Sequence, residues 1–166
     1  HNWGNKALTK LIHHWYWFRG KVGPYNGIGS NIITNPESGN QDLDVIGIMK
    51  DGKIIADDPE LLEVYRKADL YNPITEKRIS EKLLFIYRDQ TTGIDYELIL
   101  EKESSLLDVF LISNGLLRWI VRTISDFSPA YHRYKGELKL RVFKEGQLIE
   151  SYSGKDLVWE LMYFGN

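Results

Sequence analysis

The sequence predicts an all-β domain of short antiparallel strands with one short α-helix. Segments rich in β-branched and aromatic residues alternate with tight-turn signals, and a single segment has helical spacing of its apolar residues. The chain has 166 residues, which is enough for one hydrophobic core, so we expect residues 1–166 to form a single domain. These elements fit an antiparallel barrel or a sandwich.

Two strands are expected near the start of the chain, over residues 11–22 and 25–34. The first reads LIHHWYWFRGKV and ends at the turn signal Gly23-Pro24. Because side chains alternate along a strand, one face would carry His13, Trp15, Trp17 and Arg19, and the other His14, Tyr16 and Phe18. Both faces therefore carry large rings.

The middle of the chain predicts two hairpins. Residues 43–50 and 53–56 flank Asp51-Gly52, a pair that tolerates the positive φ angles of a type I′ turn. Residues 82–88 and 94–102 flank a second loop. Residues 60–70 fit either a helical stripe or an extended edge, and we favour the strand.

The last third of the chain contains the helix candidate, residues 116–124, where LLRWIVRTI has apolar side chains at helical spacing. A separate strand is expected before it, over residues 106–112. Further strands are expected after it, over residues 136–143, 147–152 and 156–164.

Composition excludes several classes of function. The net charge of -2 gives no broad basic field, so nucleic acid is not an expected partner. The absence of cysteine excludes disulfides, thiolate zinc sites and cysteine nucleophiles, and it leaves the cellular compartment undetermined. The longest apolar runs are too short for a membrane-spanning helix, so no transmembrane segment is expected.

Three stretches resemble the second lipocalin-like domain of the carotenoid 1,2-hydratase and AttH-like family, which includes pericyclase-type enzymes of polyketide biosynthesis. They are HNWG at residues 1–4 with the W-x-W-x-R pattern at residues 15–19, YHRYKG at residues 131–136, and the closing segment at residues 154–165. The resemblance implies a lipocalin-like antiparallel β-barrel that forms the C-terminal half of a two-barrel protein.

The same resemblance implies a partner for this barrel. The chain begins at His1 rather than at methionine, so we expect a fragment of a longer protein in which residues 1–10 are an interdomain linker. The expected partner is a missing N-terminal barrel or a second copy of the chain. One hypothesis makes this barrel a structural half that mainly docks against that partner.

The leading functional hypothesis is a barrel that binds an apolar, lipid-like molecule of the isoprenoid or polyketide type. Five tryptophans and ten tyrosines exceed what a core of this size needs for filling. Gly27 and Gly29 indicate a bulge or a close approach by ligand or backbone. The expected ligand-binding residues are His1, Trp3, His13, Trp15, Trp17, Arg19, Tyr25 and Tyr163.

The alternative is an enzyme, a hydratase, isomerase or cyclase that acts on an apolar polyene by acid catalysis at the junction of two barrels. Such catalysis needs a carboxylic acid held neutral in an apolar pocket, and aromatic faces to stabilise the resulting cation. The family's hydratases are expected to carry a Tyr-x-Asp pair in the strand after W-x-W-x-R, whereas residues 27–31 read GIGSN.

Glu160 and Asp44 are the remaining candidate acids. Glu160 has a rival interpretation as an architectural carboxylate paired with Arg19. No cofactor is implied. A metal site is not expected, because His13 and His14 are neighbours on a strand and would point to opposite faces.

Overall fold

The computed structural model describes residues 8–110, 115, 119 and 128–164, and most of these lie in strands. The strands are β1 (Ile12–Val22), β2 (Tyr25–Thr34), β3 (Asp42–Lys50), β4 (Lys53–Ala56), β5 (Leu62–Asn72), β6 (Lys77–Asp89), β7 (Ile94–Phe110), β8 (Ala130–Lys144) and β9 (Gln147–Tyr163). Three short 3-10 helices are η1 (Leu8–Lys10), η2 (Pro36–Ser38) and η3 (Pro59–Leu61).

The expected all-β, lipocalin-like barrel is confirmed. Within the described residues, nine strands form one antiparallel sheet in the order β4-β3-β2-β1-β9-β8-β7-β6-β5. The short helix expected over residues 116–124 lies outside the described residues except for Trp119, which is helical. No helix in the described part is long and apolar enough to cross a membrane.

Two breaks that we expected between strands are absent, and β6 and β8 begin five and six residues earlier than expected. β7 runs without interruption from Ile94 to Phe110, where we expected two strands, and β9 likewise joins the segments 147–152 and 156–164. β-bulges shift the pairing register of β7 and β8 between Lys102 and Ser104 and again between Ser105 and Leu107. A bulge interrupts alternation without ending the strand, so the sequence pattern suggested a break there.

The expected turn at Asp51-Gly52 and the expected strand within residues 60–70 are both present in the structure. Asp51 and Gly52 both have positive φ, at 50° and 79°, as the expected tight hairpin between β3 and β4 requires. The ambiguous segment at residues 60–70 begins as η3 and continues as the edge strand β5, which confirms the strand.

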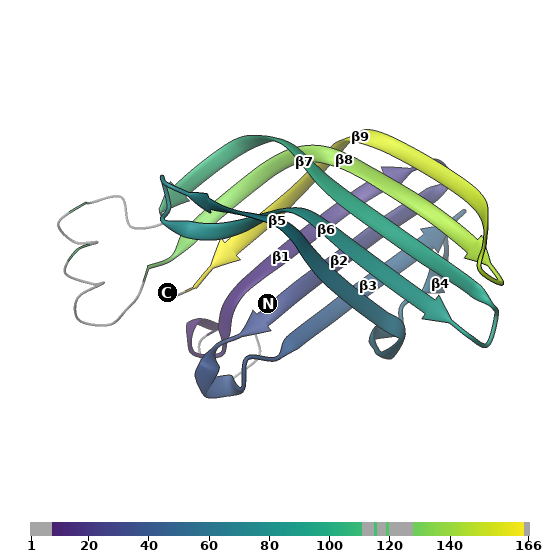
Figure 1. The fold of residues 1–166 in the computed structure, drawn as a ribbon, viewed down its shortest axis with the longest axis horizontal. Helices are drawn as coiled ribbons and strands as arrows, with labels where there is room; N and C mark the ends of the chain where they lie inside the picture. The colour runs from purple at the N-terminus through teal and green to yellow at the C-terminus, as the bar shows by residue number, and fades with distance from the viewer. Residues whose placement is uncertain (1–7, 111–114, 116–118, 120–127, 165–166) are drawn as a thin grey trace.

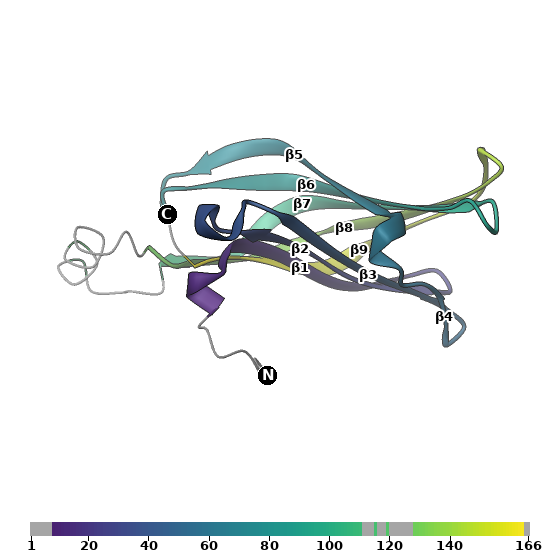
Figure 2. The same cartoon turned by 90° about the horizontal axis from the view of Figure 1, so that it is seen from below.

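The sheet curls over itself into two facing layers, with β5 and β6 opposite β1–β3 (Figures 1 and 2). No backbone ladder joins the two ends of this sheet among the described strands. Side chains bridge the gap instead: Arg66 Nη1 of β5 donates to Asn31 Oδ1 of β2 at 3.0 Å and to Asp42 Oδ1 of β3 at 3.2 Å. We call this contact the seam.

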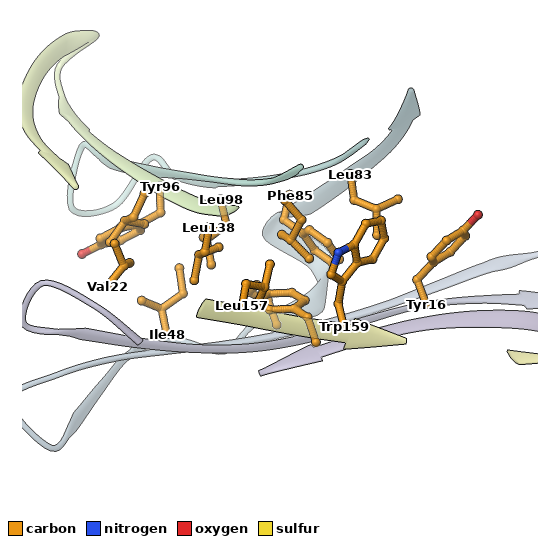
Figure 3. Close-up of a cluster of buried hydrophobic side chains, with 14 of the residues drawn as sticks. Tyr16, Val22, Ile48, Leu83, Phe85, Tyr96, Leu98, Leu138, Leu157 and Trp159 are labelled. Carbon is orange, nitrogen blue, oxygen red and sulfur yellow. The ribbon is translucent and has the colours of Figure 1, made fainter. Parts of the chain in front are cut away.

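The middle of the barrel interior is filled by side chains from both layers, as Figure 3 shows. The rings of Phe18 and Phe85 lie 5.0 Å apart, and Trp159 packs between Tyr16 and Tyr134. Gly29 lets Phe18 lie flat on the sheet, because a Cβ there would be 2.4 Å from the Phe18 ring. The closest neighbour of this glycine is therefore a core side chain, rather than the ligand or backbone that we expected.

The two outer faces of the barrel differ in chemistry. Cross-strand ion pairs cover the outer face of β6, β7 and β8, for example Glu101 with Lys82 at 2.6 Å and with Lys139 at 2.5 Å. Apolar side chains cover the outer face of β1–β4, and several of them are exposed: Trp17, Ile28, Leu43, Val45, Met49 and Ile54. The candidate site lies on this apolar face.

Candidate functional site: an apolar groove on the outer face

The central strand of the apolar face is β1, which turns Trp15, Trp17 and Arg19 outward. Tyr16 and Phe18 point inward and are almost completely buried. Trp15 and Trp17, two of the expected ligand-binding residues, therefore lie on the outside of the barrel. The alternation itself was right, but the inner face is the one that carries Tyr16 and Phe18.

The register between strands arranges the neighbours of these two tryptophans. Trp15 lies between Ile32 of β2 and Met162 of β9, and Trp17 lies between Ser30 and Glu160. Two hollows meet at Trp17. The first, of about 490 Å³, is lined by Trp15, Trp17, Ser30, Ile32 and Glu160. The second, of about 450 Å³, is lined by Trp17, Arg19, Asn26, Gly27, Ile28, Gly47, Met49, Ile54 and Asp57. We call the two together the groove.

Small residues between large ones give the groove its depth. Ser30 lies opposite Trp17, and its hydroxyl donates to the Tyr16 carbonyl at 2.8 Å. The hydroxyl is therefore held close to the backbone of the sheet. Gly47 lies opposite Ile28, and a Cβ on it would be 3.1 Å from the Ile28 Cγ2 atom. A larger side chain at either position would fill the space next to Trp17.

Trp17 is 37% exposed, although it is a large apolar side chain. Trp15 is half-buried, with its ring edge-on to Phe164 at 4.8 Å. Covering such rings removes apolar surface from water at roughly 25 cal/mol per Å². Binding of an apolar molecule that covers these rings is therefore favourable.

Glu160 is the carboxylate in the hollow next to the tryptophans. Its Oε1 lies 3.6 Å from Arg133 Nε of β8, and the expected pair with Arg19 is not formed. Tyr131 also hydrogen-bonds Glu160, and burial together with this carboxylate raises the pKa of Tyr131 to about 12. The architectural partner of Glu160 is thus Arg133.

Arg19 lies at the other end of the groove with Asn26 and Asp57. Its neighbours across the sheet are Ile28 of β2 and Val158 of β9, both apolar. Within the described part of the chain, Arg19 forms no ion pair. Among the described residues, the carboxylate in this hollow is that of Asp57, which forms no ion pair with Arg19.

The structure places three other predicted site residues inside the barrel, away from the groove. Tyr25 donates to Glu150 Oε2 at 3.0 Å, and Lys50 lies over its ring. Tyr163 donates to the Arg78 carbonyl near the opposite end of the interior. Asp44 accepts a 2.5 Å hydrogen bond from Asn31, and burial raises the pKa of this carboxyl. Predicted residues His1 and Trp3 lie outside the described residues.

We expected the two adjacent histidines to point to opposite faces of the strand, and the structure shows that they do not. A register shift between Ile12 and His14 brings His13 Nδ1 within 2.7 Å of His14 Nδ1. His14 stacks on Tyr163 with ring centroids 4.8 Å apart. Among the described residues, no group of three or more His, Cys, Asp or Glu side chains is placed to hold a metal ion.

Sequence reasoning missed a polar cluster in the interior. His132 Nδ1 donates to Asp108 Oδ1 at 2.6 Å, and its Nε2 lies 3.2 Å from Thr75 Oγ1. The order hydroxyl, imidazole and carboxylate matches that of a nucleophile with its base, but Thr75 and His132 are both completely buried. The cluster therefore ties the β5–β6 turn to β7 and β8.

One signal for this cluster was present in the sequence. Alternation in YHRYKG places His132 and Tyr134 on the same face of a strand, and the structure turns that face inward. Asp108 and Thr75 come from distant segments, so only the fold could bring them to His132. Burial raises the pKa of the Tyr134 hydroxyl, which has no hydrogen-bond partner among the described residues.

The fold and its outer groove define a lipocalin-like antiparallel β-barrel. The sequence matches no known family model and no curated protein sequence. Among solved structures it is similar in fold to CghA, crystallised with Sch210972, with a TM-score of 0.66 and 12% identity over 96% of this chain. It is also similar to kievitone hydratase from Nectria haematococca, with a TM-score of 0.52 and 14% identity over 97% of this chain.

The chain is much shorter than these similar structures. It spans 42% of the length of the CghA chain and 42% of the kievitone hydratase chain. At such low identity the likeness concerns the fold.

Proposed function

We propose that this domain binds an apolar, lipid-like small molecule of the isoprenoid or polyketide type in the groove. The observation that carries the proposal is the pair of hollows meeting at Trp17, on a face where a solvated barrel would carry polar side chains. Each hollow has a volume within the usual range of ligand pockets, roughly 300 to 1,000 Å³.

The packing of the barrel interior supports a ligand site on the outer face. The middle of the barrel is occupied from both layers by Phe85, Leu98, Leu138, Leu157 and Trp159, as seen in Figure 3. A ligand in the groove needs no rearrangement of this core. It contacts the faces of the aromatic rings that the core leaves exposed.

The test is a titration with all-trans retinol, a polyene whose absorption overlaps tryptophan emission. We expect saturable quenching of the protein fluorescence. Trp17→Ala should weaken retinol binding about tenfold, since it removes the ring shared by both hollows. Binding is measured by calorimetry as well, because the variant also changes the fluorescence.

The matched control is Tyr71→Ala, which removes an exposed ring from β5, outside the groove. This variant should bind retinol as the unaltered protein does. Retinol affinity that is the same in Trp17→Ala, or that falls equally in both variants, contradicts binding in the groove.

A second candidate function is an acid-catalysed hydratase, isomerase or cyclase, in line with the resemblance to the hydratase family. It is favoured by the position of Glu160 in the same hollow as Trp15 and Trp17. The Arg133 contact works against it, because that ion pair needs the charged carboxylate whereas proton donation needs the neutral acid. Incubation with lycopene, an acyclic polyene, tests it: a product heavier by one water that Glu160→Gln abolishes would support the enzyme.

We also propose that the remainder of the apolar face docks against another barrel, either an N-terminal barrel of the same protein or a second copy of this chain. Leu43, Val45 and Ile54 are each about half exposed or more, and they extend the groove into a wider apolar surface. Contiguous apolar surface of this kind marks interaction sites in proteins.

A further inference from the structure

We propose that the groove selects an anionic ligand: an elongated apolar molecule whose carboxylate binds Arg19 and Asn26 while its hydrocarbon part covers Trp17 and Trp15. This inference rests on the proposed function and adds the chemical class of the ligand. It follows from the arrangement of charge along the groove.

Arg19 is placed to hold an anion because it is exposed, its cross-strand neighbours are apolar, and it forms no ion pair with the described residues. Ile28 and Val158 flank it across the sheet, and the hollow beside it is lined mainly by Trp17, Met49 and Ile54. No described carboxylate lies within ion-pair distance of its guanidinium. A guanidinium binds a carboxylate through two parallel hydrogen bonds, which are stronger where apolar groups exclude water.

Asn26 adds a neutral donor beside this charge. It is half-buried in the same hollow, on the β2 position opposite Lys21. Asp57 lines the same hollow from the loop between β4 and η3, and its charge repels an anion from that side. The carboxylate of the ligand is therefore directed to the β1 side, where Arg19 lies.

The other end of the groove suits a hydrocarbon. Trp15, Trp17 and Arg19 follow one another along the outer face of β1, so the distance from the first to the last is about 13 Å at roughly 3.3 Å per residue. The polar groups near Trp15 and Trp17 already have partners: Ser30 donates to the Tyr16 carbonyl, and Glu160 faces Arg133. An extended chain leaving Arg19 meets aromatic surface without unsatisfied polar groups.

The experiment compares all-trans retinoic acid with all-trans retinol, which share a carbon skeleton and differ at the head group. Both are titrated into the full chain at neutral pH, with binding measured by calorimetry. We expect the acid to bind about tenfold more tightly than the alcohol. Added salt should weaken binding of the acid and leave binding of the alcohol unchanged.

Arg19→Gln should lower the affinity for retinoic acid to that for retinol and so remove this preference. Lys21→Gln is the matched control, because it removes one positive charge from the same face of the same strand and should keep the preference. Equal affinity for acid and alcohol, or a preference that survives Arg19→Gln, overturns the proposed selection of an anionic ligand. In either case, saturable retinol binding would still support the groove as the ligand site. Failure of both retinoids to bind overturns the groove itself.

Discussion

His14 lies in the polar end of the barrel interior, stacked on Tyr163 and in contact with His13. Burial is the main reason why its pKa falls to about 3, with the charge of His13 as the next cause. In the unfolded chain the same imidazole titrates near its ordinary value of about 6.5. The unfolded state therefore binds the extra proton between these two values.

This difference predicts that the free energy of unfolding decreases as pH falls below about 6.5 and continues to decrease towards about pH 3. The slope from this residue is up to roughly 1.4 kcal/mol per pH unit. Urea unfolding at about pH 7 and about pH 4.5 measures it. His14→Gln should lose less stability between the two pH values than the unaltered protein, and an equal loss in both would contradict the buried neutral imidazole.

Residues 13–19 show what sequence could and could not predict at this scale. The alternation of residues 14–19 was predicted correctly, with Trp15 and Arg19 on the face of Trp17, whereas the register shift at His13 was not. The choice of inner face could not be predicted, because both faces carry rings of similar size. That choice depends on partners from other strands: Gly29 accommodates Phe18, and Ser30 leaves the hollow beside Trp17.

At the scale of elements, the hairpin and its Asp51-Gly52 turn followed from local chemistry, whereas the long strands β7 and β9 did not. Polar residues Glu103 to Ser105 interrupt the alternation of β7, and the register shifts there while the strand continues. Gly136 of β8 permits this close pairing, since a Cβ on it would lie 2.2 Å from the Glu101 carbonyl oxygen. A bulge depends on the facing strand, so one strand's sequence does not define it.

The hydrogen bonds of the seam come from Arg66 of β5. Arg66 donates to Asn31, which is 1% exposed, and to Asp42. Arg66→Met should lower the free energy of unfolding by about 1–3 kcal/mol, because a buried amide oxygen loses its donor. It should also speed hydrogen exchange along β5, an end strand of the sheet.

Arg88→Met is the control for this prediction. Arg88 pairs with Glu63 at 2.7 Å across β5 and β6, but both side chains are about half exposed. Such surface pairs contribute about 0–1 kcal/mol. Urea unfolding of the two variants compares them, and equal destabilisation would show that the seam is no more important than a surface ion pair.

At the scale of the whole molecule, the charged face over β6–β8 and the apolar face over β1–β4 give the barrel two unlike sides. The charged side carries ion pairs suited to water, and the apolar side carries the groove and the surface around it. CghA and kievitone hydratase chains of the same fold are more than twice as long as this chain. A barrel with one apolar side is suited to a larger assembly.

If another barrel covers the apolar face, a second copy can take that place when this chain is studied alone. We expect concentration-dependent dimers in sedimentation velocity experiments, formed through the face around Val45. Val45→Lys should shift the equilibrium to monomer, because pairing would bury the new charge. Ile149→Lys is the matched control: Val45 and Ile149 are both 52% exposed, but Ile149 lies in β9 near its turn with β8. A wholly monomeric chain, or equal dissociation by both substitutions, would contradict docking through the apolar face.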